Sequence, residues 1–202
     1  MQRDRKVTRW IAAWTWACLW FAAPTVASAQ ITAPGNHVHY AVELEPHLLL
    51  QWARQEGYDQ GIGFGARVSV PIIDNGPIPN INNTLAFTTG LDLGFFTADC
   101  VDCSAWQIWA PVAAQWNFYF SPELAAFGEL GLALQYFNAT VADVPANMVC
   151  VTGDPAVRCE DFDGVNVQPV VWVGGRYLPT DTLAFTLRLG FPSLNIGASF
   201  LF

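Results

Sequence analysis

Charged residues are scarce in this chain of 202 residues: they make up 13% of it, against 52% hydrophobic residues. An average soluble domain carries about 25% charged residues. Disordered chains and chains that bind nucleic acids need many charges or a basic surface. The composition therefore argues against both of these classes.

Long apolar runs are also missing beyond the N-terminal region. A membrane-spanning helix needs about 18 or more consecutive apolar residues. Here the apolar residues are instead interrupted at every second position, which is the period of a β-strand with two different faces. This alternation directs the interpretation of the whole chain.

The first 29 residues have the pattern of a signal peptide. Four basic residues precede an apolar stretch over 10–26, and Ala27-Ser28-Ala29 supplies the small-residue site that signal peptidase reads. We therefore predict cleavage before Gln30, which leaves 30–202 as a single exported domain. The alternative is an uncleaved anchor helix.

Removing that segment changes the charge balance. The remaining chain keeps five arginines, no lysine and sixteen acidic residues, a formal charge of −11. A nucleic-acid partner is not expected at this charge.

The alternation is strongest in the first segment, where Leu44, Leu48 and Leu50 share one face and Glu43, Glu45 and His47 lie nearer the other. Eight segments alternate in this way: 38–52, 62–72, 85–95, 106–119, 124–136, 165–177, 182–191 and 194–202. Most exceed the usual ~5–6 residues of a soluble strand and fit the ~9–11 residues that cross a bilayer. An even number of strands places both termini on one side, and a membrane requires the sheet to close. The predicted fold is all-β, an eight-stranded antiparallel up-and-down transmembrane β-barrel.

The connections support this topology. Short turns at 121–122 and 179–181, together with 73–83, belong to one end; the other end carries 53–60, 97–104, 138–163 and the tight Pro192-Ser193 connection. Aromatic residues near the strand ends are interpreted as membrane-interface girdles, although their β-propensity is an alternative reason for their presence. They are Trp52, Phe95, Phe96, Trp106, Phe118, Phe120, Tyr136 and Tyr177.

The chain resembles the small eight-stranded outer-membrane barrels of the OmpA/OmpX type. The features that carry this resemblance are the signal peptide, the eight segments and the ending Gly197-Ala198-Ser199-Phe200-Leu201-Phe202. In that family a terminal Phe after alternating apolar residues is offered to the barrel insertion machinery, a role that the resemblance gives to Phe200 and Phe202. It also implies a monomer in the outer membrane of a Gram-negative bacterium, in contact with membrane lipid and lipopolysaccharide.

Three prolines fall inside predicted strands: Pro46, Pro111 and Pro169. Each removes a ladder donor, so we expect bulges or misplaced strand boundaries there. A secreted soluble barrel, with its apolar stripes pointing inward, is the structural alternative.

The candidate site is a set of charged residues on the inward face. Its members are Glu43, Glu45, Asp92, Glu129, Arg67, Arg176 and Arg188, with His47 nearby. If the first two strands form a hairpin, Glu45 lies opposite or diagonal to Arg67. Buried unpaired charges are costly, so these groups are expected to pair into a plug. The alternative is a gated polar path.

These residues favour an envelope-structural or surface-interaction role, with a narrow porin-like channel as the alternative. A lipid A-modifying enzyme is a third hypothesis, for which His47, Ser69 and Glu45 are the available nucleophile and base groups. No enzyme motif accompanies them, and we expect neither catalysis nor a cofactor.

Four cysteines follow the signal segment, at Cys100, Cys103, Cys150 and Cys159. An even number in an exported protein suggests disulfides with three possible connectivities, of which we favour the local pairs 100–103 and 150–159. A redox Cys-x-x-Cys or a zinc site is disfavoured, and no metal site is predicted. The acidic outer loops raise the hypothesis of divalent-cation or lipopolysaccharide contact.

Overall fold

The computed structural model of the chain describes residues 30–52, 60–97, 104–140 and 162–202. A short helix, η1 (Gln30–Thr32), precedes eight strands. The strands are β1 (Glu43–Gln51), β2 (Gly61–Ile73), β3 (Asn83–Thr97), β4 (Ser104–Tyr119), β5 (Leu124–Thr140), β6 (Phe162–Thr180), β7 (Leu183–Phe191) and β8 (Ser193–Leu201). Among the described residues, no helix has the length and hydropathy that crossing a membrane requires.

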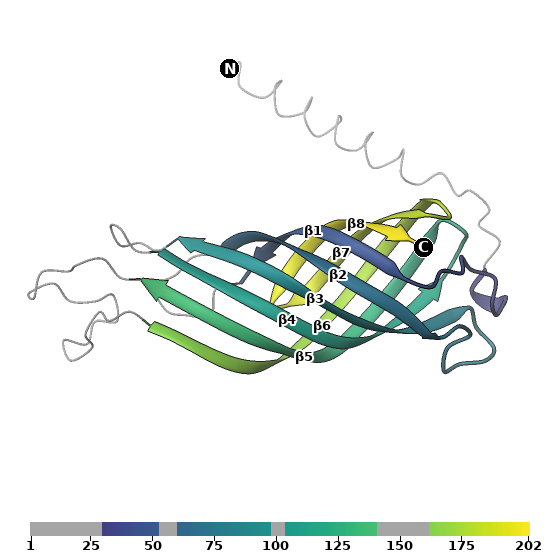
Figure 1. Ribbon diagram of the computed structural model, residues 1–202. Helices are drawn as coiled ribbons and strands as arrows, with labels where there is room; N and C mark the ends of the chain where they lie inside the picture. The colour runs from purple at the N-terminus through teal and green to yellow at the C-terminus, as the bar shows by residue number, and fades with distance from the viewer. Residues whose placement is uncertain (1–29, 53–59, 98–103, 141–161) are drawn as a thin grey trace, which may run out of the picture.

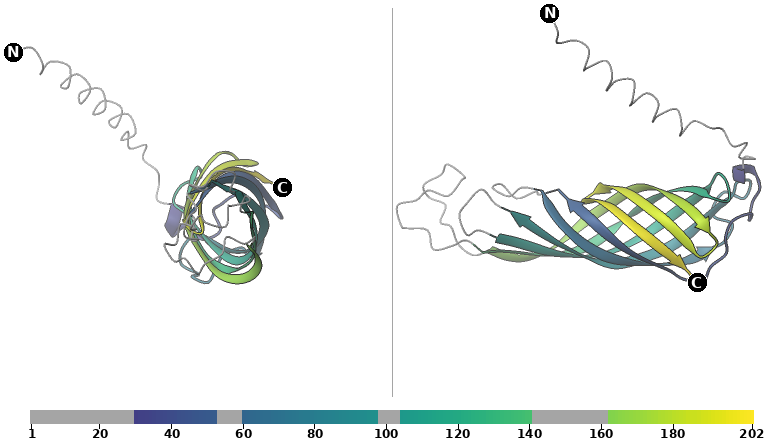
Figure 2. Two further views of the ribbon diagram at one scale, coloured as in Figure 1. Left: turned by 90° about the vertical axis from the view of Figure 1, so that its left-hand side faces the viewer. Right: turned by 90° about the horizontal axis from the view of Figure 1, so that it is seen from above.

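Each strand pairs antiparallel with the next, and β8 pairs with β1, so the sheet closes into a barrel. Figure 2 shows the ring in the view down the barrel. The start of β1 and the end of β8 lie together at one end, here called the terminal end; the opposite end is the loop end (Figure 1). The predicted fold class and strand number are confirmed.

The strands differ greatly in length. β1, β7 and β8 have nine residues each, whereas β4, β5 and β6 have 16, 17 and 19. β6 pairs with β7 from Val171 toward the terminal end. Among the described residues, 162–170 of β6 therefore pair with β5 alone. The longer strands therefore project beyond the closed barrel at the loop end, as Figure 1 shows. We call this part of β4, β5 and β6 the projecting sheet.

Burial alternates along the strands. In β1, Glu43, Glu45 and His47 are buried, while Leu48 on the other face is 70% exposed. Leu130 in β5 is likewise 67% exposed. A soluble protein rarely exposes apolar patches beyond a few hundred Å², whereas this wall is apolar around the barrel. The alternative of a soluble barrel with inward apolar stripes is therefore wrong.

Aromatic rings mark both margins of the outer wall. Trp106 and Tyr136 contact near the loop end with ring centroids 5.3 Å apart, and Trp116 and Phe118 contact near the terminal end at 4.8 Å. One predicted girdle residue is misassigned. Phe96 is buried on the inner face with Phe137, because it follows the outward Phe95 directly and so takes the opposite parity.

The expectation of bulges or boundary errors at the three internal prolines is wrong. Pro46 stands opposite Ala66, Pro111 opposite Ala133 and Pro169 opposite Leu132, with the register unchanged on either side.

A missing donor is tolerated at these prolines because the neighbouring pairing is open where they lie. The β1–β8 pairs skip Pro46, and the β3–β4 pairs skip Pro111, whose carbonyl accepts from the Thr89 hydroxyl. Pro169 lies beyond the end of β7. The irregularity in β2 occurs instead between Pro71 and Ile73.

The first strand begins later than predicted, at Glu43 instead of residue 38. Val38 and Tyr40 pack against a buried cluster at the terminal end that contains Tyr119, Leu178 and Leu201. The alternation over 38–42 therefore reflects one side of a covering segment instead of a strand.

Arginine on the outer wall tests the placement in lipid. Leu130→Arg is expected to lower the free energy of unfolding by about 2–4 kcal/mol, since a cation near the bilayer midplane is desolvated; Val165→Arg, near the loop end of β6, should cost about 0–1 kcal/mol. The measurement is urea unfolding of the refolded protein in lipid vesicles, followed by tryptophan fluorescence. Equal losses at both positions would contradict the placement.

Candidate functional site

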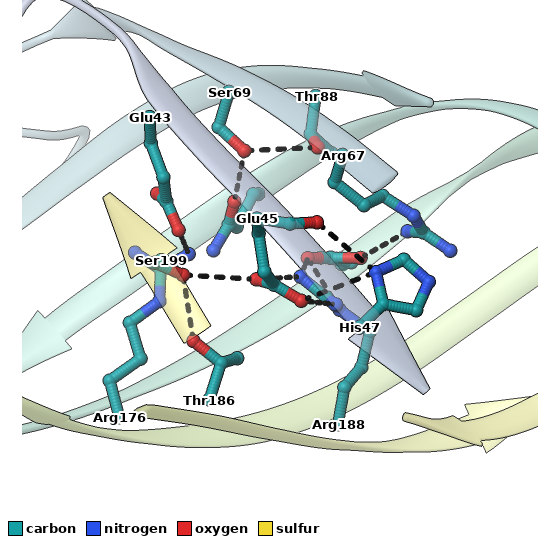
Figure 3. Close-up of polar contacts among 12 residues, drawn as sticks. Glu43, Glu45, His47, Arg67, Ser69, Thr88, Arg176, Thr186, Arg188 and Ser199 are labelled. Carbon is teal, nitrogen blue, oxygen red and sulfur yellow. Dashed lines mark hydrogen bonds and ion pairs between the residues drawn. The ribbon is translucent and has the colours of Figure 1, made fainter. Parts of the chain in front are cut away.

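The barrel interior collects charge because the strands alternate. All eight residues of the predicted charged set lie on inner faces, and each is at most 5% exposed. They come from six strands, as Figure 3 shows for most of them. Ionic side chains therefore line the barrel at mid-height, whereas aliphatic side chains fill the core of an ordinary domain.

Arg188 of β7 crosses the lumen to two carboxylates. Its Nη1 donates to Glu45 Oε1 at 2.6 Å and its Nη2 to Glu45 Oε2 at 3.1 Å, a bidentate pair. Its Nε donates to Glu129 Oε1 at 3.1 Å. Paired, nearly parallel donors of this kind fix both distance and orientation.

Arg67 of β2 continues the network from the other oxygen of Glu129. Its Nη1 lies 3.4 Å from Glu129 Oε2, and its Nη2 donates to Asp92 Oδ2 at 2.8 Å. The remaining Asp92 oxygen, Oδ1, lies 2.9 Å from His47 Nε2. His47 Nδ1 in turn lies 3.8 Å from Glu45 Oε1, so the circuit closes. We call Glu45, His47, Arg67, Asp92, Glu129 and Arg188 the charge ring.

Register alone does not predict these partners. Glu45 does stand opposite Arg67 in the β1–β2 ladder, as the hairpin predicted. Its ion pair is nevertheless with Arg188, 143 residues away in sequence, because long side chains reach across the lumen.

Arg176 and Glu43 form a separate pair nearer the terminal end. Arg176 Nη2 lies 2.8 Å from Glu43 Oε1, and the Tyr40 hydroxyl donates to Glu43 Oε2 at 3.4 Å. The Phe127 ring lies between the two arginines, 5.0 Å from the Arg176 guanidinium carbon and 5.2 Å from that of Arg188.

Neutral polar side chains continue the packing on both sides of the charge ring. Toward the loop end, Gln135 donates to Gln107 at 2.7 Å and Gln107 donates to Gln51 at 3.0 Å. Toward the terminal end a hydrogen-bonded chain runs through Thr88, Ser69, Gln115, Asn117, Thr84 and Tyr119. The alternation predicted the inward position of many of these residues, but no sequence signal distinguishes their partners.

The segment before β1 covers the terminal end. Asn82 donates its side-chain amide to the Asn36 carbonyl, and its Oδ1 accepts from His37 Nδ1 at 2.7 Å. The His37 ring stacks on Tyr119 with centroids 4.6 Å apart. Burial is the main reason that the pKa of His37 falls below its ordinary value, and burial likewise raises the pKa of Tyr40.

Packing at mid-height leaves little room for water. The side chains of Arg67, Glu129 and Arg188 have no exposed surface, and Trp172 lies 4.3 Å from the Arg67 guanidinium carbon. Gly65 belongs to the same packing, because a Cβ there would meet Asp92 Oδ1 and lie 2.7 Å from His47 Nε2. Within the described ranges, no group of three or more metal-ligating side chains is arranged to hold an ion.

The nucleophile arrangement considered for an enzyme does not form. Ser69 Oγ bonds to Thr88 and Gln115, whereas His47 bonds to Asp92, so serine and imidazole are not paired. Phe200 and Phe202 lie exposed on the outer wall at the terminal end. Cys100, Cys103, Cys150, Cys159 and the signal segment lie outside the described residues.

Comparison with known proteins gives a structural match. No family model and no curated protein matches the chain. The crystal structure of Ail, the attachment invasion locus protein of Yersinia pestis, superposes with a TM-score of 0.53 at 10% identity, covering 81% of this chain and 99% of Ail. This chain has the fold of a small eight-stranded barrel. A second Ail structure, in complex with the heparin analogue sucrose octasulfate, gives a TM-score of 0.48 at 11% identity over 80% of this chain and 97% of that one.

A double-mutant cycle tests the bidentate pair. Arg188→Met is expected to lower the free energy of unfolding by about 3–5 kcal/mol, since it leaves the buried Glu45 carboxylate without its bidentate arginine. Adding Glu45→Gln should recover part of that loss, with a coupling of about 0.5–3 kcal/mol. Urea unfolding in vesicles measures both.

The control pairs Arg188→Met with Glu123→Gln, a change in the exposed turn before β5. These two effects should add to within about 0.5 kcal/mol. A Glu45–Arg188 cycle that is equally additive would show that the two side chains do not interact.

Proposed function

We propose that the chain is a non-conducting outer-membrane barrel of a Gram-negative bacterium, with an envelope-structural or surface-interaction role. The observation that carries this proposal is the charge ring, whose six side chains fill mid-height and are at most 5% exposed. A lumen filled by paired side chains is a packed core, as the interior of an eight-stranded barrel has the dimensions to be.

Energetics favour a permanently closed lumen over a gated one. A solute passing mid-height would have to separate Arg188 from Glu45 and Arg67 from Asp92, both at contact distances of 2.6–2.8 Å. Breaking a single buried pair costs about 3–5 kcal/mol. A path that requires several such losses at once is not populated under ordinary conditions.

The outer wall supports the location. Its apolar side chains and aromatic margins suit a bilayer, and a closed sheet satisfies every backbone group that lipid leaves without water. The terminal Phe200 and Phe202 fit a role in delivery by the barrel insertion machinery. We expect a monomer that contacts outer-membrane lipid and lipopolysaccharide.

A surface-interaction role is supported by the projecting sheet. In the part of the chain that the structure describes, no strand pairs with the second edge of residues 162–170 of β6, which we call the free edge. A free edge can add an extended strand from another protein. Pro169 lies on this edge. Because N–H directions alternate along a strand, the N–H of Val167 faces the same side as the missing donor of Pro169. Ail, which shares the fold, is by its printed name an attachment protein.

Planar-bilayer conductance tests the closed lumen. Wild-type protein is expected to show no large steady openings, whereas Arg67→Ala should increase leakage because it removes the link between Asp92 and Glu129. Leu130→Ala, on the outer wall, serves as the control and should behave as wild type. Large steady channels from wild-type protein would overturn the proposal in favour of a narrow porin.

The Val167→Pro variant distinguishes the surface-interaction role from the envelope-structural role. It removes one donor from the free edge and leaves the β5 side paired, so the barrel should fold and insert as wild type does. In a strain that lacks the wild-type gene, we expect the variant to restore detergent resistance but to reduce bacterial attachment to cultured cells. Attachment equal to wild type would place any surface contact elsewhere, and lost detergent resistance would indicate a structural role for the edge itself.

A further inference from the structure

His47 has an acceptor at each of its two ring nitrogens. Nε2 lies 2.9 Å from Asp92 Oδ1, and Nδ1 lies 3.3 Å from the backbone carbonyl oxygen of Glu45. A backbone carbonyl only accepts, and an ionised carboxylate only accepts. A neutral imidazole has one N–H and could satisfy one of the two contacts, whereas an imidazolium satisfies both.

The sum of the charges in the ring also indicates a protonated His47. Glu45, Asp92 and Glu129 contribute three negative charges and Arg67 and Arg188 two positive ones, so a neutral His47 leaves the ring at −1. A protonated His47 makes it neutral. Glu43 and Arg176 already balance each other. An uncompensated charge on a fully buried side chain is costly.

Every strand that contributes to the ring presents a charged group in the network around His47. Glu45 lies on its own strand and Asp92 on β3, both in contact with the imidazole. Arg67 on β2, Glu129 on β5 and Arg188 on β7 complete the circuit. The two carboxylates in direct contact favour a cation at His47, and the two arginines are each engaged by two carboxylates.

We infer that the folded barrel holds His47 as an imidazolium, so that the charge ring contains one bound proton that completes its charge balance. This inference concerns the interior alone and does not depend on the proposed surface role.

Nitrogen NMR of the full chain, with histidine labelled at both ring nitrogens and the protein refolded in lipid, tests the inference directly. His37→Gln and His39→Gln variants identify the signals of the other two histidines. We expect both ring nitrogens of His47 to be protonated at neutral pH. A neutral ring, with one bare nitrogen at neutral pH, would overturn the inference.

Asp92→Asn supplies the matched variant. It removes one negative charge, so Glu45 and Glu129 then balance Arg67 and Arg188, and His47 should become neutral at a pH where the wild type keeps its proton. Asp163→Asn, an exposed carboxyl group on β6, is the control and should leave the His47 signals unchanged. A His47 that stays cationic in Asp92→Asn would contradict the charge-balance argument. If Asp92→Asn does not fold, the wild-type spectrum at neutral pH still decides the question.

Discussion

The charged side chains inside the barrel are buried, and the need to pair each of them determines how the interior is arranged. Four carboxylates and three guanidinium groups of the described residues lie on inner faces, and each of these carboxylates contacts at least one arginine. Glu129 and the two ring arginines each bridge two partners, so the pairs are linked into one network. The paired polar side chains fill the lumen in the way that aliphatic side chains fill an ordinary core. Most of the large apolar residues lie on the outer wall instead.

Small residues make the network possible. Gly65 has no side chain at the point where Asp92 and His47 meet. At Gly94 the side-chain oxygen of Gln51 occupies the position that a Cβ would take. The inner alternation of large charged residues with glycine therefore has a packing cause. Gly128, on the outer wall, has no atom within 4 Å of its Cβ position and has no such role.

The sequence predicts well the features that depend on the two-residue period of a β-strand. The number of strands, the inward parity of Glu43, Glu45 and Arg67, and the apolar wall all follow from alternation, which is local. Boundaries were less predictable: residues 38–42 alternate like a strand but cover the terminal end, where Val38 and Tyr40 meet Tyr119 and Leu178. Partner choice was not predictable, because Glu45 prefers a bidentate arginine across the lumen to the arginine opposite it. Such choices depend on side-chain length and barrel diameter, which no single strand contains.

The pairing of Glu45 with Arg188 joins the first strand to the seventh, across 143 residues of sequence. A chain that has formed only its early hairpins holds Glu45 without Arg188, its bidentate partner. Contacts of such long range form late and slow the search for the folded state. The ring is therefore complete only once β7 has joined the barrel, and its bidentate pair links the order of the strands to the closure of the sheet.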